Sequence, residues 1–148
     1  MIMTLTPHFA LSEFTHSQTA ARLGITNAAT SPTLIANIRR TATMLEKVRV
    51  ILGKPILVSS GYRCPELNAA VGGSQNSAHV DGLAVDFTCP GFGSPRDICY
   101  ALSPFLDQLE IDQMIFEFTA WVHLGLSADT PRLMALTIDG RGTREGIA

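Results

Sequence analysis

The ten residues SAHVDGLAVD, from 77 to 86, contain two side chains that can bind a metal ion. His79 offers an imidazole nitrogen and Asp86 a carboxylate. Gly82 lies between them and allows a sharp turn, after which a strand would bring Asp86 back beside His79. Zinc binds nitrogen, sulfur and oxygen ligands in a tetrahedral arrangement, and a catalytic zinc leaves one position to water. The segment therefore indicates two ligands of a catalytic zinc site.

A third ligand is expected from a neighbouring strand, and His123 in WVHLGL is the histidine that remains outside the N-terminal region. It lies between apolar residues, where an imidazole without a hydrogen-bond partner would be costly to bury. Spacing alone leaves other interpretations open. A single histidine on an apolar strand is more often a hydrogen-bonded core residue than a ligand, and Asp86 can instead cap a turn or pair with an arginine.

The most regular element that can position such a site is SPTLIANIRRTATMLEKVRVILGKP, residues 31–55. Its apolar residues recur at intervals of three and four and predict a helix with one buried face. Ser31 can cap the start of this helix, Pro32 suits the first helical position, and Gly53 with Pro55 would end it. We expect this helix to be the scaffold of the fold.

Around the scaffold helix, the sequence predicts short helices and strands bounded by glycine and proline. Helices are expected in LSEFTHSQTAARLGITN, ending at Gly24, in PELNAAVGG, and in SPRDICYALSPFLDQL, which Ser94 would cap and Pro104 would kink. Strands are expected in ILVSSGYRCP and GLAVDFTCPG, and DQMIFEF, AWVHLGL and LMALTID should form an antiparallel meander. The order predicts an α+β fold in which N-terminal helices, including a helical segment over residues 1–30, pack on a small, mainly antiparallel sheet. Residues 140–148 are expected to form a loose tail.

Composition suits a single domain over residues 1–148. Apolar residues make up 46% and charged residues 16%, which is enough to bury a core, and the formal net charge is −2. Without a basic run, the chain gives no support to a nucleic-acid or membrane-surface partner. No segment approaches the roughly 18 apolar residues of a membrane span, and the first residues do not resemble a secretory signal, so we expect a cytoplasmic monomer. Three cysteines without CxxC spacing, Cys64, Cys89 and Cys99, are expected to be small buried residues, and oxidation of one pair is the alternative.

The motifs resemble those of one enzyme family. SAHVDGLAVD fits the SxHxxGxAxD motif of the zinc D-Ala-D-Ala metallopeptidases, which have the hedgehog/DD-peptidase fold, and WVH fits their WxH element. SSGYRCPELNAAVGGSQNSAH and HFALSEFTHSQTAARLGITN resemble segments of the phage and prophage, endolysin-like members. The resemblance spans roughly Pro7 to Leu126. It implies one zinc ion bound by His79, Asp86 and His123, with the pKa of the zinc-bound water lowered to about 7.

The resemblance also implies a carboxylate that takes a proton from the attacking water. In the family this acid often precedes the last histidine by three positions, where the present chain has Ala120. The nearest acid is Glu117. If the intervening turn has two residues, Glu117 pairs with Val122 and faces away from His123; with three, it lies opposite Trp121 and shares the histidine's face, because side chains alternate along a strand. We predict the second register and Glu117 as the catalytic base, with a solvent-facing Glu117 as the alternative.

Three further residues are predicted at the site. Arg63, in SSGYR, matches the family's substrate-binding arginine and would hold a carboxylate or a polarised carbonyl oxygen, which makes it both a binding and a catalytic residue; a structural salt bridge is its alternative. Ser77 would hydrogen-bond substrate or stabilise the loop. Trp121 is expected in the wall of the cleft, with the core as its alternative, and Tyr62 in the packing.

The leading hypothesis is therefore a zinc peptidase that cuts peptidoglycan stem peptides, either as a carboxypeptidase or as an endopeptidase. Such an enzyme would wait in the cytoplasm for phage or prophage lysis, or be carried in a virion. A second hypothesis is an inactive, zinc-stabilised wall-binding or phage structural protein, which Ala120 at the usual base position would suit. A third is a cytoplasmic dipeptidase or amidase.

Overall fold

The computed structural model describes residues 2–148 of the chain. Helices dominate its first half, and a run of four strands ends it, in keeping with the α+β prediction. In chain order they are β1 (Thr4–Thr6), β2 (Phe9–Ala10), α1 (Leu11–Thr15), α2 (Gln18–Leu23), α3 (Pro32–Leu52), β3 (Leu57–Ser60), α4 (Pro65–Ala70), β4 (Ala84–Thr88), α5 (Pro95–Leu102), a 3-10 turn η1 (Ser103–Phe105), β5 (Gln113–Glu117), β6 (Trp121–Gly125), β7 (Met134–Asp139) and β8 (Gly142–Glu145).

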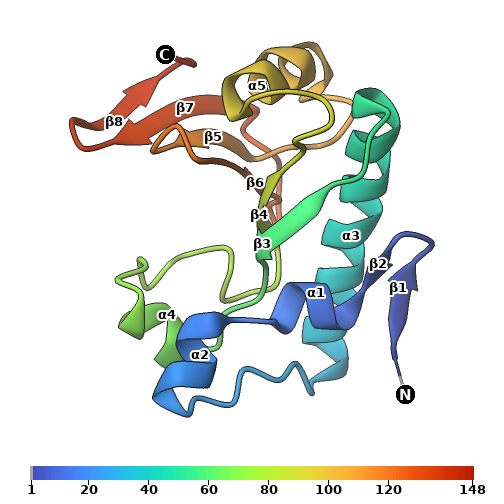
Figure 1. The fold of residues 1–148 in the computed structure, drawn as a ribbon, viewed down its shortest axis with the longest axis vertical. Helices are drawn as coiled ribbons and strands as arrows, with labels where there is room; N and C mark the ends of the chain where they lie inside the picture. The colour runs from blue at the N-terminus through green and yellow to red at the C-terminus, as the bar shows by residue number, and fades with distance from the viewer. Residues whose placement is uncertain (1) are drawn as a thin grey trace.

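The main sheet has the strand order β3-β4-β6-β5-β7-β8, and its neighbours are antiparallel except for the β5–β7 pair. Strands β1 and β2 form a separate small hairpin. In Figure 1, α3 runs along one side of the sheet, α5 lies near β5 and β7, and α1, α2 and α4 lie at the lower end of the molecule. The α+β prediction with a mainly antiparallel sheet is confirmed.

Helix α3 has the predicted start, end and buried face. The Ser31 hydroxyl accepts a hydrogen bond from the N–H of Leu34, and Gly53 ends the helix in the left-handed conformation, with φ of 67°. Ile38 and Leu45 are fully buried on its inner face. Burial of each such side chain contributes about 1.5–3 kcal/mol. Packing of this stripe against the sheet therefore anchors the fold.

The sheet separates a hydrophobic core from the polar side chains of the site. Val85 and Phe87 of β4 are fully buried in one cluster with residues of α3 and α5. Because side chains alternate along a strand, Asp86 between them points to the other face. This face carries the histidines and acids singled out in the sequence.

The predicted meander is wrong. β5 and β6 form the expected hairpin, but β7 pairs with β5, in parallel, rather than with β6. Residues 126–133 carry the chain across to the far edge of β5, where Met134 pairs with Gln113. β6 has no free edge left, because its other side already pairs with β4. The sequence therefore predicted the three strands correctly but the wrong pairing partner for β7.

The predicted loose tail at 140–148 is also wrong. Residues 142–145 form β8, which pairs with β7 after a turn at residues 140–141. Arg144 binds Asp139 across the hairpin at 2.9 Å, and the N–H of Ala148 donates to the Thr137 hydroxyl. The segment has few apolar residues, but its backbone pairs with the edge that β7 presents, and this pairing orders it.

Two smaller differences concern helices. The N-terminal region holds the β1–β2 hairpin and two short helices, because the Ser17 hydroxyl caps α2 and so separates it from α1; Gly24 ends α2 as predicted. Ser94 caps α5 as predicted. Instead of a kink at Pro104, α5 ends at Leu102 and continues as η1, since a proline within a helix removes a backbone hydrogen bond.

Candidate metal centre

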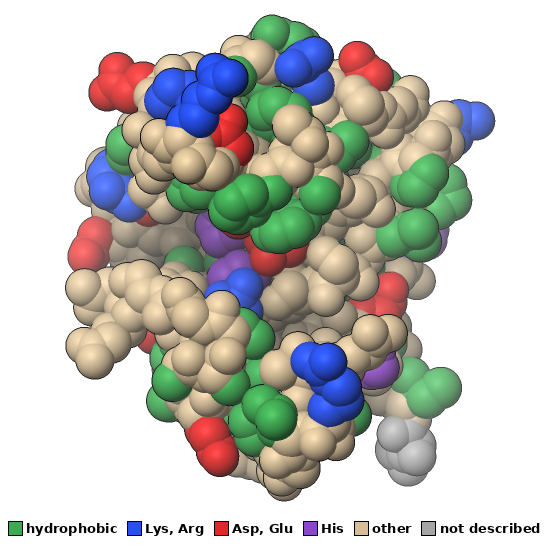
Figure 2. All heavy atoms as spheres, turned by 60° about the vertical axis from the view of Figure 1, so that its left-hand side comes forward, with side chains coloured by type: hydrophobic (Ala, Val, Ile, Leu, Met, Phe, Trp, Pro, Cys, Tyr) green, Lys and Arg blue, Asp and Glu red, His purple; other side chains and the backbone are tan. Residues whose placement is uncertain are grey.

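His79, Asp86 and His123 meet in one buried cluster. Each offers a ligand atom within 4.8 Å of the others, and their exposed fractions are 3%, 5% and 7%. Asp86 and His123 are direct cross-strand partners on β4 and β6, while His79 comes from the turn that precedes β4. In Figure 2, histidine side chains lie at the floor of a hollow with acidic and basic side chains beside them.

Two hydrogen bonds fix the orientation of His79. Its Nδ1 lies 2.6 Å from the carbonyl oxygen of Gly61, so Nδ1 carries the proton and donates. Its own carbonyl accepts from the N–H of Arg63 at 3.1 Å. Nε2 is thereby left without a proton and faces Asp86 Oδ1 at 3.3 Å. A backbone carbonyl that fixes the tautomer of an imidazole in this way is typical of metal-binding histidines.

His123 approaches the same carboxylate oxygen from the opposite strand. Its Nδ1 is 2.9 Å from Asp86 Oδ1, and its ring centroid is 5.0 Å from that of His79. On its other side lies Gly125, where a Cβ atom would come within 3.3 Å of His123 Nε2. The absence of a side chain at position 125 therefore gives the ring the room it occupies.

The charges of the cluster suit a divalent cation. Burial alone would raise the pKa of Asp86, but the hydrogen bond with His123 opposes it, and the pKa of Asp86 lies well below its usual range. Burial lowers the pKa of His79, against the attraction of Asp86, and favours the neutral ring. An ionised carboxylate with neutral imidazole is a donor set that zinc binds. The residues therefore fit the metal.

The register of Glu117 is the predicted one. Glu117 pairs with Trp121 across a three-residue turn, Phe118–Ala120, and so shares the face of His123. Its Oε1 is 3.7 Å from His123 Nδ1. Burial, and then the negative charge of Asp86, raise the pKa of Glu117 above its ordinary value. An acid held beside the cluster with a raised pKa has the properties of a proton acceptor at the site, and the catalytic role stays a prediction.

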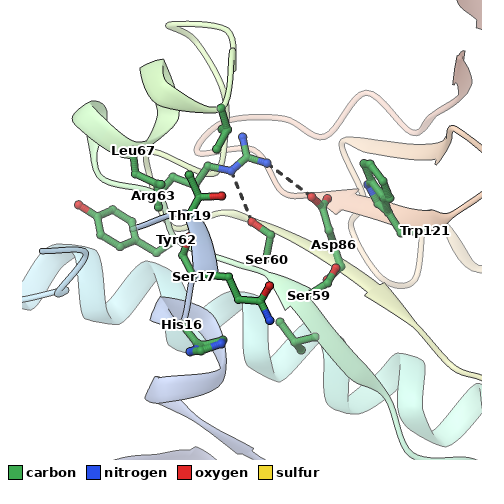
Figure 3. Close-up of a pocket in the computed structure, with 13 residues that line it drawn as sticks. His16, Ser17, Thr19, Ser59, Ser60, Tyr62, Arg63, Leu67, Asp86 and Trp121 are labelled. Carbon is green, nitrogen blue, oxygen red and sulfur yellow. Dashed lines mark hydrogen bonds and ion pairs between the residues drawn. The ribbon is translucent and has the colours of Figure 1, made fainter. Parts of the chain in front are cut away.

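Arg63 reaches the cluster from the loop that follows β3. Its Nη2 lies 3.5 Å from Asp86 Oδ2, its Nη1 donates to Asn68 Oδ1 at 3.2 Å, and its Nε donates to the Ser60 hydroxyl at 3.4 Å. Figure 3 shows the guanidinium between Ser60 and Asp86. The salt-bridge interpretation of Arg63 is thus realised, in a position that also faces the cleft.

A cleft of about 600 Å³ leads to the cluster. Its lining comes from three parts of the chain that are distant in sequence, together with two single residues. These are 16–19 before and in α2, 58–63 except Gly61, Leu67 and Val71 of the α4 region, and then Asp86 and Trp121. Trp121 stands in the wall as predicted, and Tyr62 is both packed and part of the lining.

Ser77 supports the loop that carries His79. Its hydroxyl accepts from the N–H of His79 at 3.3 Å, and it is not part of the cleft lining. Of its two predicted roles, the structure therefore shows the support of the loop. Sequence reasoning missed Asn68, which is buried and binds both Arg63 and the carbonyl of Ser74. No motif marks an asparagine in a short helix for that role.

The comparison with known families agrees with this geometry. A family model described as Peptidase M15 matches residues 7–125. The chain belongs to the peptidase M15 family. Membership implies a metallopeptidase, M15 peptidases depend on zinc, and the buried His-Asp-His cluster is a group that could hold the ion. No curated protein matches the chain. None of the helices in residues 2–148 is both long and apolar enough to cross a membrane.

Proposed function

We propose that this M15 peptidase hydrolyses peptide bonds in the stem peptides of bacterial peptidoglycan, as a D-Ala-D-Ala carboxypeptidase or endopeptidase of the phage endolysin type. The observation that carries the proposal is the position of Glu117, whose carboxylate lies beside a buried His-Asp-His cluster at the end of an open cleft. The wall substrate is supported by the resemblance of SAHVDGLAVD and WVH to the enzymes that cut D-Ala-D-Ala bonds.

His79, Asp86 and His123 would hold one zinc ion, which polarises a carbonyl and lowers the pKa of bound water to about 7. Glu117 accepts the proton of the attacking water on its carboxylate and passes it to the leaving amine. The raised pKa of Glu117 serves the second step, because the protonated acid then forms more readily near neutral pH.

Arg63 orients the substrate. Its guanidinium faces the cleft and is only partly neutralised by Asp86, since their nearest atoms are 3.5 Å apart. It can therefore bind the C-terminal carboxylate of a stem peptide or the carbonyl oxygen that gains charge during attack. Trp121 forms the opposite wall and limits the space available to the peptide. The enzyme would act as a monomer, reaching the wall after lysis or from a virion.

One observation favours the alternative of an inactive, zinc-stabilised wall-binding or phage structural protein. The position three residues before His123, where relatives often carry the base, is Ala120, which is exposed in the turn. Glu117 compensates for this only if its carboxylate does the chemistry. The two functions therefore differ in what the loss of Glu117 does.

The deciding experiment is turnover of purified peptidoglycan, followed by mass spectrometry, at equal zinc content. Wild type, Glu117→Gln and Glu117→Ala are compared with Glu110→Gln, which neutralises an exposed acid away from the cleft. We expect cleavage by wild type and Glu110→Gln, and a loss of about 10²- to 10⁴-fold in both Glu117 variants. Equal activity in all four would show that another group is the base. Zinc binding without cleavage by any of them would favour the wall-binding function.

A further inference from the structure

Strand β3 is the terminal strand of the main sheet, and α1 lies close to it. Residues Leu57–Ser60 pair only with β4, and within residues 2–148 their backbone groups make no hydrogen bond to any other element. In an antiparallel ladder, every second residue turns its N–H and C=O away from the partner strand. β3 therefore presents backbone donors and acceptors that a further strand can pair with.

The cleft passes over this edge. Val58 pairs with Phe87, whose side chain lies in the core, whereas Ser60 pairs with Asp86, whose side chain lies in the metal cluster. Direct cross-strand partners share a face of the sheet, so Val58 and Ser60 belong to opposite faces. Both nevertheless line the same cleft. A cavity lined by both faces of an edge strand has to include the edge itself.

A β-bulge at Ser59 produces this arrangement. The register moves from Val58↔Phe87 to Ser60↔Asp86, which leaves Ser59 as the extra residue. Its hydroxyl donates to the carbonyl of Asp86 at 3.2 Å and holds the bulge in place. Bulges occur often beside active sites, where they redirect side chains and backbone. Here the bulge turns Ser60 towards Arg63 while Val58 stays with the core.

The other lining residues place the edge of β3 inside a groove. Residues His16–Thr19 form part of its wall, and Arg63, Asp86 and Trp121 lie where it reaches the metal cluster (Figure 3). Apart from His16, the lining contains one basic side chain, Arg63, and one acidic side chain, Asp86. Most of the groove is therefore uncharged and suits a main chain more than a charged ligand.

We propose that the substrate peptide binds as an added strand along the outer edge of β3, where the cleft passes, in an extended conformation that carries the cleaved bond to the His79–Asp86–His123 cluster. This inference rests on the proposed peptidase function and adds the way in which the substrate is held. Main-chain hydrogen bonds to Leu57–Ser60 supply affinity, and successive side chains of the peptide point to opposite sides. In such a strand, backbone N–H groups alternate in direction. Of two consecutive amides of the bound peptide, therefore, only one points toward β3 and hydrogen-bonds to it.

A pair of methylated substrates tests the prediction. The probe is the pentapeptide L-Ala-γ-D-Glu-L-Lys-D-Ala-D-Ala, N-methylated in turn at each of the two amides that precede the cleaved bond. With the zinc-loaded full chain, one methyl group should raise KM about fivefold to tenfold, and the other should change it less than about twofold. Equal effects at both amides, or no effect at either, would overturn the added-strand arrangement.

A binding measurement separates this inference from the peptidase function. The same pentapeptide, with its cleaved amide reduced to a non-hydrolysable bond, is added to the ¹⁵N-labelled chain, and amide exchange is followed by NMR. β8 is the matched control, since it is the other edge of the same sheet and lines no part of the cleft. Slower amide exchange at Leu57–Ser60, with unchanged exchange at Gly142–Glu145, supports the proposal even if no peptide is cleaved. Unchanged exchange at both edges, with the peptide bound, refutes the proposal while leaving the peptidase function intact; no binding and no cleavage refutes both.

Discussion

Gly61 connects the packing of the N-terminal helices to the metal cluster, and Gly61→Ala should disturb both. A Cβ atom at position 61 would lie 2.7 Å from the Cα of Phe14, 2.7 Å from its carbonyl oxygen and 2.8 Å from its Cδ1. Two of these are backbone atoms of α1, which cannot rotate away. The N–H of Tyr62 donates to the Phe14 carbonyl at 2.7 Å and holds α1 against this point. The methyl group therefore has to push the helix or the loop aside.

The cost follows from overpacking, which is about 1–3 kcal/mol. In a chain of 148 residues this corresponds to a fall in Tm of about 3 to 10 °C. The carbonyl of Gly61 accepts the hydrogen bond that orients His79, so its displacement should also weaken zinc binding by about 10- to 100-fold. Both effects come from a residue that contacts no metal.

Calorimetry of the metal-free chain measures the first effect, and competition with a chromophoric chelator measures the second. Gly140→Ala is the matched control, because its Cβ would meet nothing within 4 Å and its φ is not in the left-handed region. That variant should melt within about 2 °C of wild type. Equal melting temperatures and equal zinc affinity in the two variants would refute the close approach of Gly61 to Phe14 and its role in holding His79.

Three further predictions concern other parts of the chain. Thr119, in the turn after Glu117, has φ of 57°, so Thr119→Gly should raise the free energy of unfolding, measured by urea titration, by about 1 kcal/mol. Ala120→Gly should not raise it, and equal effects of the two changes would argue against strain in the turn. Hydrogen bonds from Arg132 lower the pKa of Asp112. Wild type should therefore be more stable than Asp112→Asn above the unfolded pKa of about 3.9, and should lose this advantage as the pH falls through the lower folded pKa. A stability difference that persists unchanged at pH 2 would contradict the ion pair. Zinc at a hundred times its Kd should stabilise wild type by about 2.7 kcal/mol and Asp86→Asn far less, measured by calorimetry with and without chelator, and equal stabilisation would place the ion elsewhere.

Helix and strand boundaries were predicted well where residues close in sequence determine them. Ser31, Pro32 and Gly53 fix the ends of α3 because a cap, a first-turn proline and a left-handed glycine each act within a few residues. The place of β7 could not be obtained in this way. Its pairing with β5 depends on which edges remain free once β4 has taken one side of β6, and that is a property of the whole sheet. β8 was missed for the same reason, since an available edge and not its own sequence orders it.

The site divides along the same line. Strand alternation was enough to decide that Glu117 shares the face of His123 if the turn has three residues, and this is what the hairpin adopts. Alternation could not show that the Ser77 hydroxyl supports the His79 backbone, or that Asn68 holds Arg63. Those contacts join loops whose paths are set by packing, and no periodic pattern describes such paths.

The end of β3 explains why these loops are nevertheless held in position. The Gly61 carbonyl accepts the hydrogen bond of His79 Nδ1, and the N–H of Arg63 donates to the His79 carbonyl. Residues 61–63 therefore hold both the imidazole and the backbone of His79. The same short segment carries the guanidinium that reaches Asp86 and continues directly from the edge on which we place the substrate. A shift of β3 would therefore move ligand, arginine and peptide together. This linkage predicts that changes in β3 alter zinc affinity and KM in parallel, whereas changes in the Glu117 turn alter kcat with little effect on zinc.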